Sequence, residues 1–225
     1  KKQLDIIREK IILSANKSNR KIEEIQIIAV TKTYPFNAIE SAYNNNILIV
    51  GENKVQEAIN KISGQTIPNN MEIHLIGHLQ TNKINKAISV FDVIQTVDSF
   101  SLAQKLNTAC QKINKIQRIY IQINSGDDPL KYGFAVNEVI HIVKKINKLS
   151  NLMLEGVMMI PPFTDINNQY RNIFKKTKSI QLDIYNSGIK NCVNISMGMS
   201  RDYEIAIEEG ATQVRIGTAL FGMRT

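Results

Sequence analysis

The chain has 225 residues and a formal net charge of +8; 43% of it is hydrophobic and only 6% aromatic, so we expect a sizeable, mainly aliphatic core. Its Lys and Arg residues occur as singles and pairs without a basic run or interleaved aromatic side chains, which argues against a nucleic-acid-binding module. Cys110 and Cys192 form no CxxC or Cys/His cluster, so neither a zinc site nor a disulfide framework is predicted, and a reduced cytosolic setting is expected.

The chain is predicted to begin with an amphipathic helix. Its apolar residues recur at helical spacing, so one face should pack against a larger body. These residues are Leu4, Ile7, Ile11, Ile12 and Ala15. Charges interrupt this stretch, and no later apolar run approaches the roughly 20 residues that span a bilayer, so we expect no targeting signal and no membrane association.

From residue 26 onward, short apolar runs alternate with longer amphipathic stretches. We predict strands at 26–30, 47–50, 73–76, 93–97, 119–123, 152–159, 193–195 and 213–216. The helices predicted between them lie near 36–45, 54–62, 81–89, 100–114, 136–149, 167–186 and 201–209. About eight such repeats without a linker favour a single α/β domain over residues 1–225, a closed (β/α)8 TIM-type barrel with an extra N-terminal helix. A doubly wound open sheet is the alternative, weakened because no Gly-rich dinucleotide fingerprint follows the first strand.

Lys32 is the first candidate for chemistry, because it directly follows a buried strand. In a parallel barrel, the loops after the strands form the active face. Burial at this point would lower the pKa of the lysine amine and let it form a Schiff base with a carbonyl compound. The alternative is a lysine that reaches solvent at the rim of the barrel.

Hydroxyls and glycines follow the last two strands, where barrel loops commonly hold a phosphate. The residues that we predict to contact this phosphate are Ser196, Gly198, Ser200, Gly217 and Thr218. Tight-turn geometry is the alternative for the two glycines, and helix capping is the alternative for Ser200. Arg215 could reach inward beside this loop or form a structural ion pair. A phosphorylated aldehyde is the ligand that suits both Lys32 and the loop.

The histidines do not predict a metal site. His74 and His78 are four residues apart, which on a strand separates them by roughly 13 Å and excludes one shared ion. The sequence also contains no Walker loop, no nucleophile elbow and no paired catalytic carboxylates.

Several long motifs, in order along the chain, resemble the pyridoxal phosphate homeostasis proteins, also described as the proline-synthetase-co-transcribed family. They are AVTK at 29–32, GENKVQE at 51–57, HLIGHLQTNK at 74–83, SMGMSRD at 196–202 and VRIGT at 214–218. The resemblance implies a barrel like the N-terminal domain of alanine racemase, with pyridoxal 5′-phosphate bound as a Schiff base on Lys32. By position, Ser196, Gly217 and Thr218 would contact the phosphate. Arg215 would face the pyridine nitrogen, and Asn53 would line the ring pocket.

The resemblance also implies a function without substantial turnover. An arginine at the pyridine nitrogen leaves it largely unprotonated and weakens the ring as an electron sink. We therefore expect a cytosolic, monomeric carrier of pyridoxal 5′-phosphate, with apoenzymes that depend on this cofactor as recipients. The alternative is an amino-acid racemase of fold type III. Such racemases add a β-rich domain and a tyrosine acid/base. Because the sequence ends at Thr225, we expect no such domain here.

Overall fold

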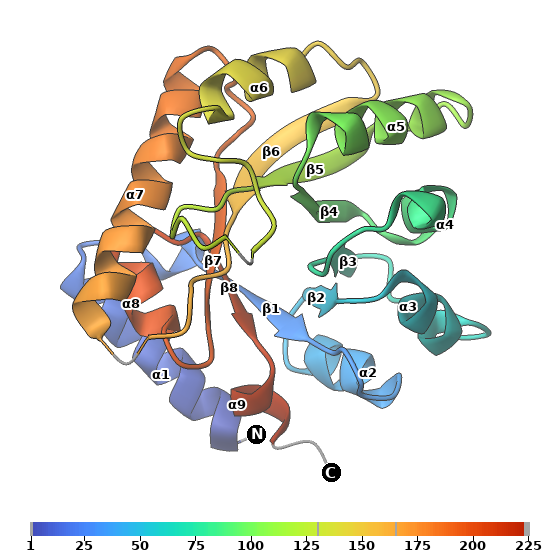
Figure 1. The fold of residues 1–225 in the computed structure, drawn as a ribbon. Coiled ribbons are helices and arrows are strands. Elements are labelled where there is room, and N and C mark those ends of the chain that lie inside the picture. Colours follow the sequence, from blue (N-terminus) through green and yellow to red (C-terminus); the bar gives the residue numbers. More distant parts are fainter. Residues whose placement is uncertain (1, 130, 165, 223–225) are drawn as a thin grey trace.

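Eight parallel strands close into a barrel in the computed structural model, which describes residues 2–129, 131–164 and 166–222. Each strand lies beside the one that follows it in the chain, and β1 pairs with β8 (Figure 1). The predicted (β/α)8 barrel is therefore confirmed. Thr225, which was named in the expectation about a further domain, lies outside the described residues. The strands are β1 (Gln26–Val30), β2 (Ile49–Glu52), β3 (Glu72–Leu75), β4 (Val93–Val97), β5 (Gln117–Gln122), β6 (Leu152–Met158), β7 (Asn194–Met199) and β8 (Gln213–Ile216).

Helices alternate with the strands and cover the outside of the barrel (Figure 1). They are α2 (Asn37–Asn44), α3 (Val55–Ile62), α4 (Ile84–Val90), α5 (Phe100–Gln111), α6 (Val139–Ile146), α7 (Asn167–Asn186), α8 (Tyr203–Glu208) and α9 (Thr218–Phe221), with the 3₁₀ helices η1 (Ile22–Glu24) and η2 (Thr81–Lys83). Helix α7 has the predicted bounds, whereas α9 was not in the predicted set. Within the described ranges, no helix combines the length and apolar composition needed to cross a bilayer.

The predicted N-terminal helix, α1 (Lys2–Lys17), packs against α8 and α9 (Figure 1). Its buried residues are Leu4, Ile7, Ile11, Ser14 and Ala15. Ile12 is 43% exposed, so its placement on the packed face was wrong. Consecutive helical residues are rotated by about 100°, so a narrow contact with one layer of helices does not reach both Ile11 and Ile12.

The register of the sheet brings the loops after β1, β2 and β8 to one end of the barrel. Val30 pairs with Gly51 of β2, and Ala29 pairs with Ile216 of β8. Because the strands are parallel, all their carboxyl ends face the same way. The residues that emerge just beyond these pairs are Lys32, Asn53 and Gly217.

The seventh strand is longer than predicted. It runs to Met199 instead of ending before Ser196, so Ser196 lies in the sheet and is fully buried. The Ser196 hydroxyl accepts a hydrogen bond from Arg215 at 2.8 Å, which satisfies a polar group inside the sheet. Gly198 has a φ of 87°, which glycine adopts readily. The second strand likewise extends to Glu52, beyond the predicted 47–50.

Hydrogen bonds between polar side chains cross the interior of the barrel. Gln95 of β4 donates to His74 of β3 at 2.8 Å and to Gln213 of β8 at 3.2 Å. Since β4 and β8 are not neighbours in the sheet, the second bond spans the interior. Burial lowers the pKa of His74, so the ring is neutral, accepts from Gln95 at Nδ1 and donates to Glu72 through Nε2 at 2.9 Å. The interior therefore contains a polar layer that the aliphatic composition did not predict.

Candidate functional site

A cavity of about 370 Å³ opens at the carboxyl end of the barrel. Its walls come from the strands β1, β7 and β8 and from segments that follow β1, β2, β3, β5, β6, β7 and β8. The cavity therefore unites residues that are distant in sequence, as expected for this end of a barrel. The predicted cofactor-binding residues that line it are Lys32, Asn53, Ser200, Arg215, Gly217 and Thr218.

Lys32 lies in a tight turn directly after β1. The amide of Tyr34 donates to the carbonyl of Thr31 at 3.0 Å and closes the turn around Lys32 and Thr33. Lys32 is half-buried and forms part of the cavity wall. This placement favours the cofactor-binding interpretation over a lysine that extends freely into solvent.

Arg215 lies at the buried end of the cavity and is held by three hydrogen bonds. Nη1 donates to the carbonyl and the hydroxyl of Ser196, each at 2.8 Å, and Nη2 donates to the carbonyl of Met159 at 2.7 Å. Burial lowers the pKa of Arg215 to about 10, so the guanidinium remains charged at neutral pH. Ser196 lies behind Arg215 and orients it, while the cavity wall itself is formed by Arg215.

The loops predicted to bind a phosphate meet where β7 and β8 end. The Ser200 hydroxyl accepts from the amide of Ala219 at 3.4 Å and so links the two loops. Gly217 is buried, and Thr218 is exposed at the start of α9. The capping alternative for Ser200 is not realised at α8, where Asp202 is the N-cap. One end of the cavity is therefore lined by two hydroxyl-bearing residues, Ser200 and Thr218, and by Gly217.

Three charged residues of the wall, Lys131, Arg201 and Asp202, received no binding role from the sequence. Lys131, in the segment after β5, donates to the carbonyl of Pro161, and burial lowers the pKa of Lys131. Asp202 accepts from the amide of Met199 at 2.5 Å, and burial raises the pKa of Asp202. The sequence could have indicated Lys131 as a wall residue, because it follows a strand that ends at the same face of the barrel as the strand before Lys32. No comparable sequence signal marks the burial of Asp202.

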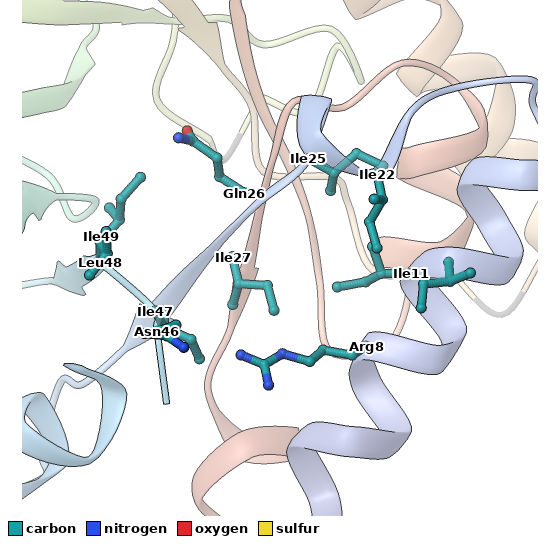
Figure 2. A pocket seen from close by; sticks show the side chains of 11 residues that line it. Arg8, Ile11, Ile22, Ile25, Gln26, Ile27, Asn46, Ile47, Leu48 and Ile49 are labelled. Atoms are coloured by element: carbon teal, nitrogen blue, oxygen red, sulfur yellow. The ribbon is translucent and has the colours of Figure 1, made fainter. Parts of the chain in front are cut away.

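A second hollow, of about 350 Å³, lies between α1 and the beginnings of β1 and β2 (Figure 2). Figure 2 shows Arg8 extending from α1 toward Asn46 and Ile47. One terminal nitrogen of Arg8 donates to the carbonyl of Asn45 at 2.5 Å, and most of the remaining wall is isoleucine. The two hollows have similar volumes, but several polar groups converge only at the carboxyl end of the barrel, which makes that cavity the better candidate.

The two histidines considered as metal ligands have different surroundings. His74 lies in the barrel interior, whereas His78 lies after β3, with Nδ1 3.0 Å from a carboxylate oxygen of Asp98. The His78 ring also stacks on Tyr132, with 4.0 Å between ring centroids. Over the part of the chain that the structure describes, no three His, Cys, Asp or Glu side chains are grouped to hold a metal ion.

Comparisons with known proteins bear on the same features. The family model described as alanine racemase, N-terminal domain, matches residues 5–225. The chain is 37% identical to the pyridoxal phosphate homeostasis protein of Haemophilus influenzae, covering 98% of this chain and 94% of that protein. The structure of PipY from Synechococcus elongatus with PLP bound has a TM-score of 0.84 at 31% identity, covering 96% of this chain and 100% of that chain. An alanine racemase from Clostridium difficile has a TM-score of 0.74 at 20% identity, covering 96% of this chain and 57% of that one.

These likenesses extend the motif resemblance to nearly the whole chain. The likeness to the racemase, at 20% identity, shows a shared fold and no more. The 37% sequence identity to the homeostasis protein, in contrast, extends over nearly the full length of both chains. The chain belongs to the pyridoxal phosphate homeostasis protein family, built on the barrel of the alanine racemase N-terminal domain.

Proposed function

We propose that residues 1–225 form a single domain that binds pyridoxal 5′-phosphate as a Schiff base on Lys32 and acts in vitamin B6 and amino-acid homeostasis. The observation that carries the proposal is one cavity that unites Lys32, Arg215 and the predicted phosphate loop. The related PipY, whose structure has PLP bound, supports the choice of ligand.

The residues of the cavity fit the three parts of this cofactor. The uncharged amine of Lys32 would add to the aldehyde carbon, and water would leave as the C=N bond forms. Ser200, Gly217 and Thr218 would donate to the phosphate oxygens, while Asn53 would line the ring pocket. Arg215, held in place by Ser196, would face the pyridine nitrogen with its charged guanidinium.

The proposed role is carriage of a reactive aldehyde without substantial turnover. A charged guanidinium at the pyridine nitrogen opposes protonation of that nitrogen, so the ring is a weak electron sink. The protein would hold the cofactor in the cytosol as a monomer and supply it to apoenzymes that depend on it. Neither a nucleic acid nor a membrane is needed for this role.

Borohydride reduction followed by peptide mapping tests the attachment site. We expect the pyridoxyl adduct on Lys32 and its loss in Lys32→Ala. Lys131→Ala is the matched control, because Lys131 is a second lysine in the wall of the same cavity. An adduct found mainly on Lys54, Lys83 or Lys131 would contradict the assignment.

Exchange of the α-proton of amino acids in deuterated water tests the absence of turnover. Racemisation requires removal of this proton on one face and its return on the other, by two positioned acid/base groups. We expect stoichiometric holoprotein to exchange the α-protons of alanine, serine and glutamate no faster than free cofactor does. Faster exchange that is abolished in Lys32→Ala would overturn the proposed absence of turnover and restore the racemase alternative.

A further inference from the structure

The turn that carries Lys32 has a conformation that depends on surrounding contacts. Thr33, which follows Lys32, has a φ of 67°. This left-handed conformation is uncommon for any residue except glycine, and a β-branched residue adopts it with strain. Strained backbone persists where neighbouring groups hold it in place. The contacts on either side of Lys32 therefore hold the backbone from which its side chain extends.

The first half of the turn is held by Lys61 of α3 and Glu52 of β2. Lys61 Nζ donates to the carbonyl of Thr31 at 2.7 Å and pairs with Oε1 of Glu52. The Thr31 hydroxyl donates to the same carboxylate oxygen at 2.6 Å. The side chains of Lys61 and Glu52 are only 5% and 1% exposed. Burial of these charges is tolerated because they are paired, and the pairing ties them to the turn.

The second half of the turn is held by Glu57, which is one helical turn before Lys61. Oε1 of Glu57 accepts a hydrogen bond from the amide of Thr33 and lies 3.7 Å from Lys61 Nζ. The strained residue is thus connected, through Glu57, to the ammonium group that also binds Thr31. Lys32 stands between these two anchored residues.

We propose that Lys61 is a positioning residue for Lys32: together with Glu52 and Glu57, it fixes the turn so that the Lys32 amine is aimed at the aldehyde. This inference rests on the proposed Schiff base at Lys32. Lys61 is not among the residues that form the cavity wall. Its effect should therefore fall on the reaction of Lys32 and spare the binding of the phosphate and the ring.

Two measurements separate these effects. Stopped-flow visible absorbance gives the rate constant of Schiff-base formation, and a titration gives the Kd of pyridoxine 5′-phosphate, which has the ring and phosphate but no aldehyde. The variants are Lys61→Met and the double variant Lys61→Met/Glu52→Gln, which keeps the test valid if an unpaired buried Glu52 prevents folding. The control is Lys10→Met, which breaks an ion pair with Glu204 whose side chains are 47% and 44% exposed.

We expect the rate constant to fall by on the order of tenfold or more in the Lys61 variants, while the Kd stays within about twofold, since misplacement of a reacting group slows the reaction without removing binding contacts. Lys10→Met should match the wild type in both measurements. An unchanged rate constant in the Lys61 variants would overturn the inference, as would a parallel loss of pyridoxine 5′-phosphate binding. Failure of the wild type to form an adduct on Lys32 would overturn the proposed function and the inference with it.

Discussion

The hydroxyl of Thr31 offers a direct measure of how firmly the Lys32 turn is held. Thr31 is fully buried and donates to the carboxylate of Glu52 at 2.6 Å. Thr31→Val removes this donor and keeps the shape of the side chain. A hydrogen bond to a charged group contributes about 1.5–3 kcal/mol to stability. We expect Thr31→Val to lower the free energy of unfolding by that amount, which corresponds to ~3–12 °C in Tm for a chain of this size.

Thr96→Val is the matched control for this substitution. Thr96 is 1% exposed, and its hydroxyl donates to the carbonyl of Gly77 at 2.7 Å. The acceptor is uncharged in this case, so the expected cost is about 0.5–1.5 kcal/mol. The difference between the two variants isolates the contribution of the charge on Glu52.

Urea unfolding followed by circular dichroism measures both costs. Burial raises the pKa of Glu52 above its usual 4.5. The excess cost of Thr31→Val should therefore shrink as the pH falls through this raised pKa, because protonated Glu52 is no longer a charged acceptor. If Thr31→Val costs no more than Thr96→Val at neutral pH, Glu52 is not a charged anchor and the reasoning is refuted.

Three further predictions concern other parts of the barrel. Gly77→Ala should lower the free energy of unfolding in urea by about 1–3 kcal/mol or more, because its Cβ would lie 2.1 Å from the carbonyl oxygen of Asn53; wild-type stability would show that these loops are not in close contact. Interactions with His74 and, to a smaller extent, with Arg118 lower the pKa of Glu72 from 4.5 to about 2, so the stabilisation by Glu72 is present above about pH 4.5 and lost as the pH falls toward 2. Glu72→Gln should flatten this part of the stability profile, and an unchanged profile would contradict the assignment. Lys32→Ala removes a half-buried amine and no core packing, so the free energy of unfolding should change by less than about 1 kcal/mol; loss of the helical circular dichroism signal would make Lys32 a structural residue.

The barrel and much of its site were predictable because their signals are local. Hydrophobic periodicity distinguishes strands from helices, and a parallel barrel places the residues after each strand at one end. This reasoning placed Lys32, Arg215 and Thr218 in one site, and the structure brings them to one cavity. The same reasoning placed Ser196 in a loop after the seventh strand, whereas it lies within that strand. Ser and Gly are typical of loops, and the sequence does not show the hydrogen-bond partner that keeps Ser196 in the sheet. Its partner, Arg215, lies on the next strand.

By itself, the sequence determined the order of the elements, the closed barrel and the family, since these follow from periodicity and from motifs that are continuous along the chain. Only the tertiary structure decided how the charged groups pair. Lys61 has the sequence context of a surface helix residue, yet its side chain is 5% exposed, between Glu52 and the turn that carries Lys32. A charged side chain can be buried only where the fold brings a partner within hydrogen-bonding distance. When the partner is distant in the sequence, the sequence alone does not reveal the pair.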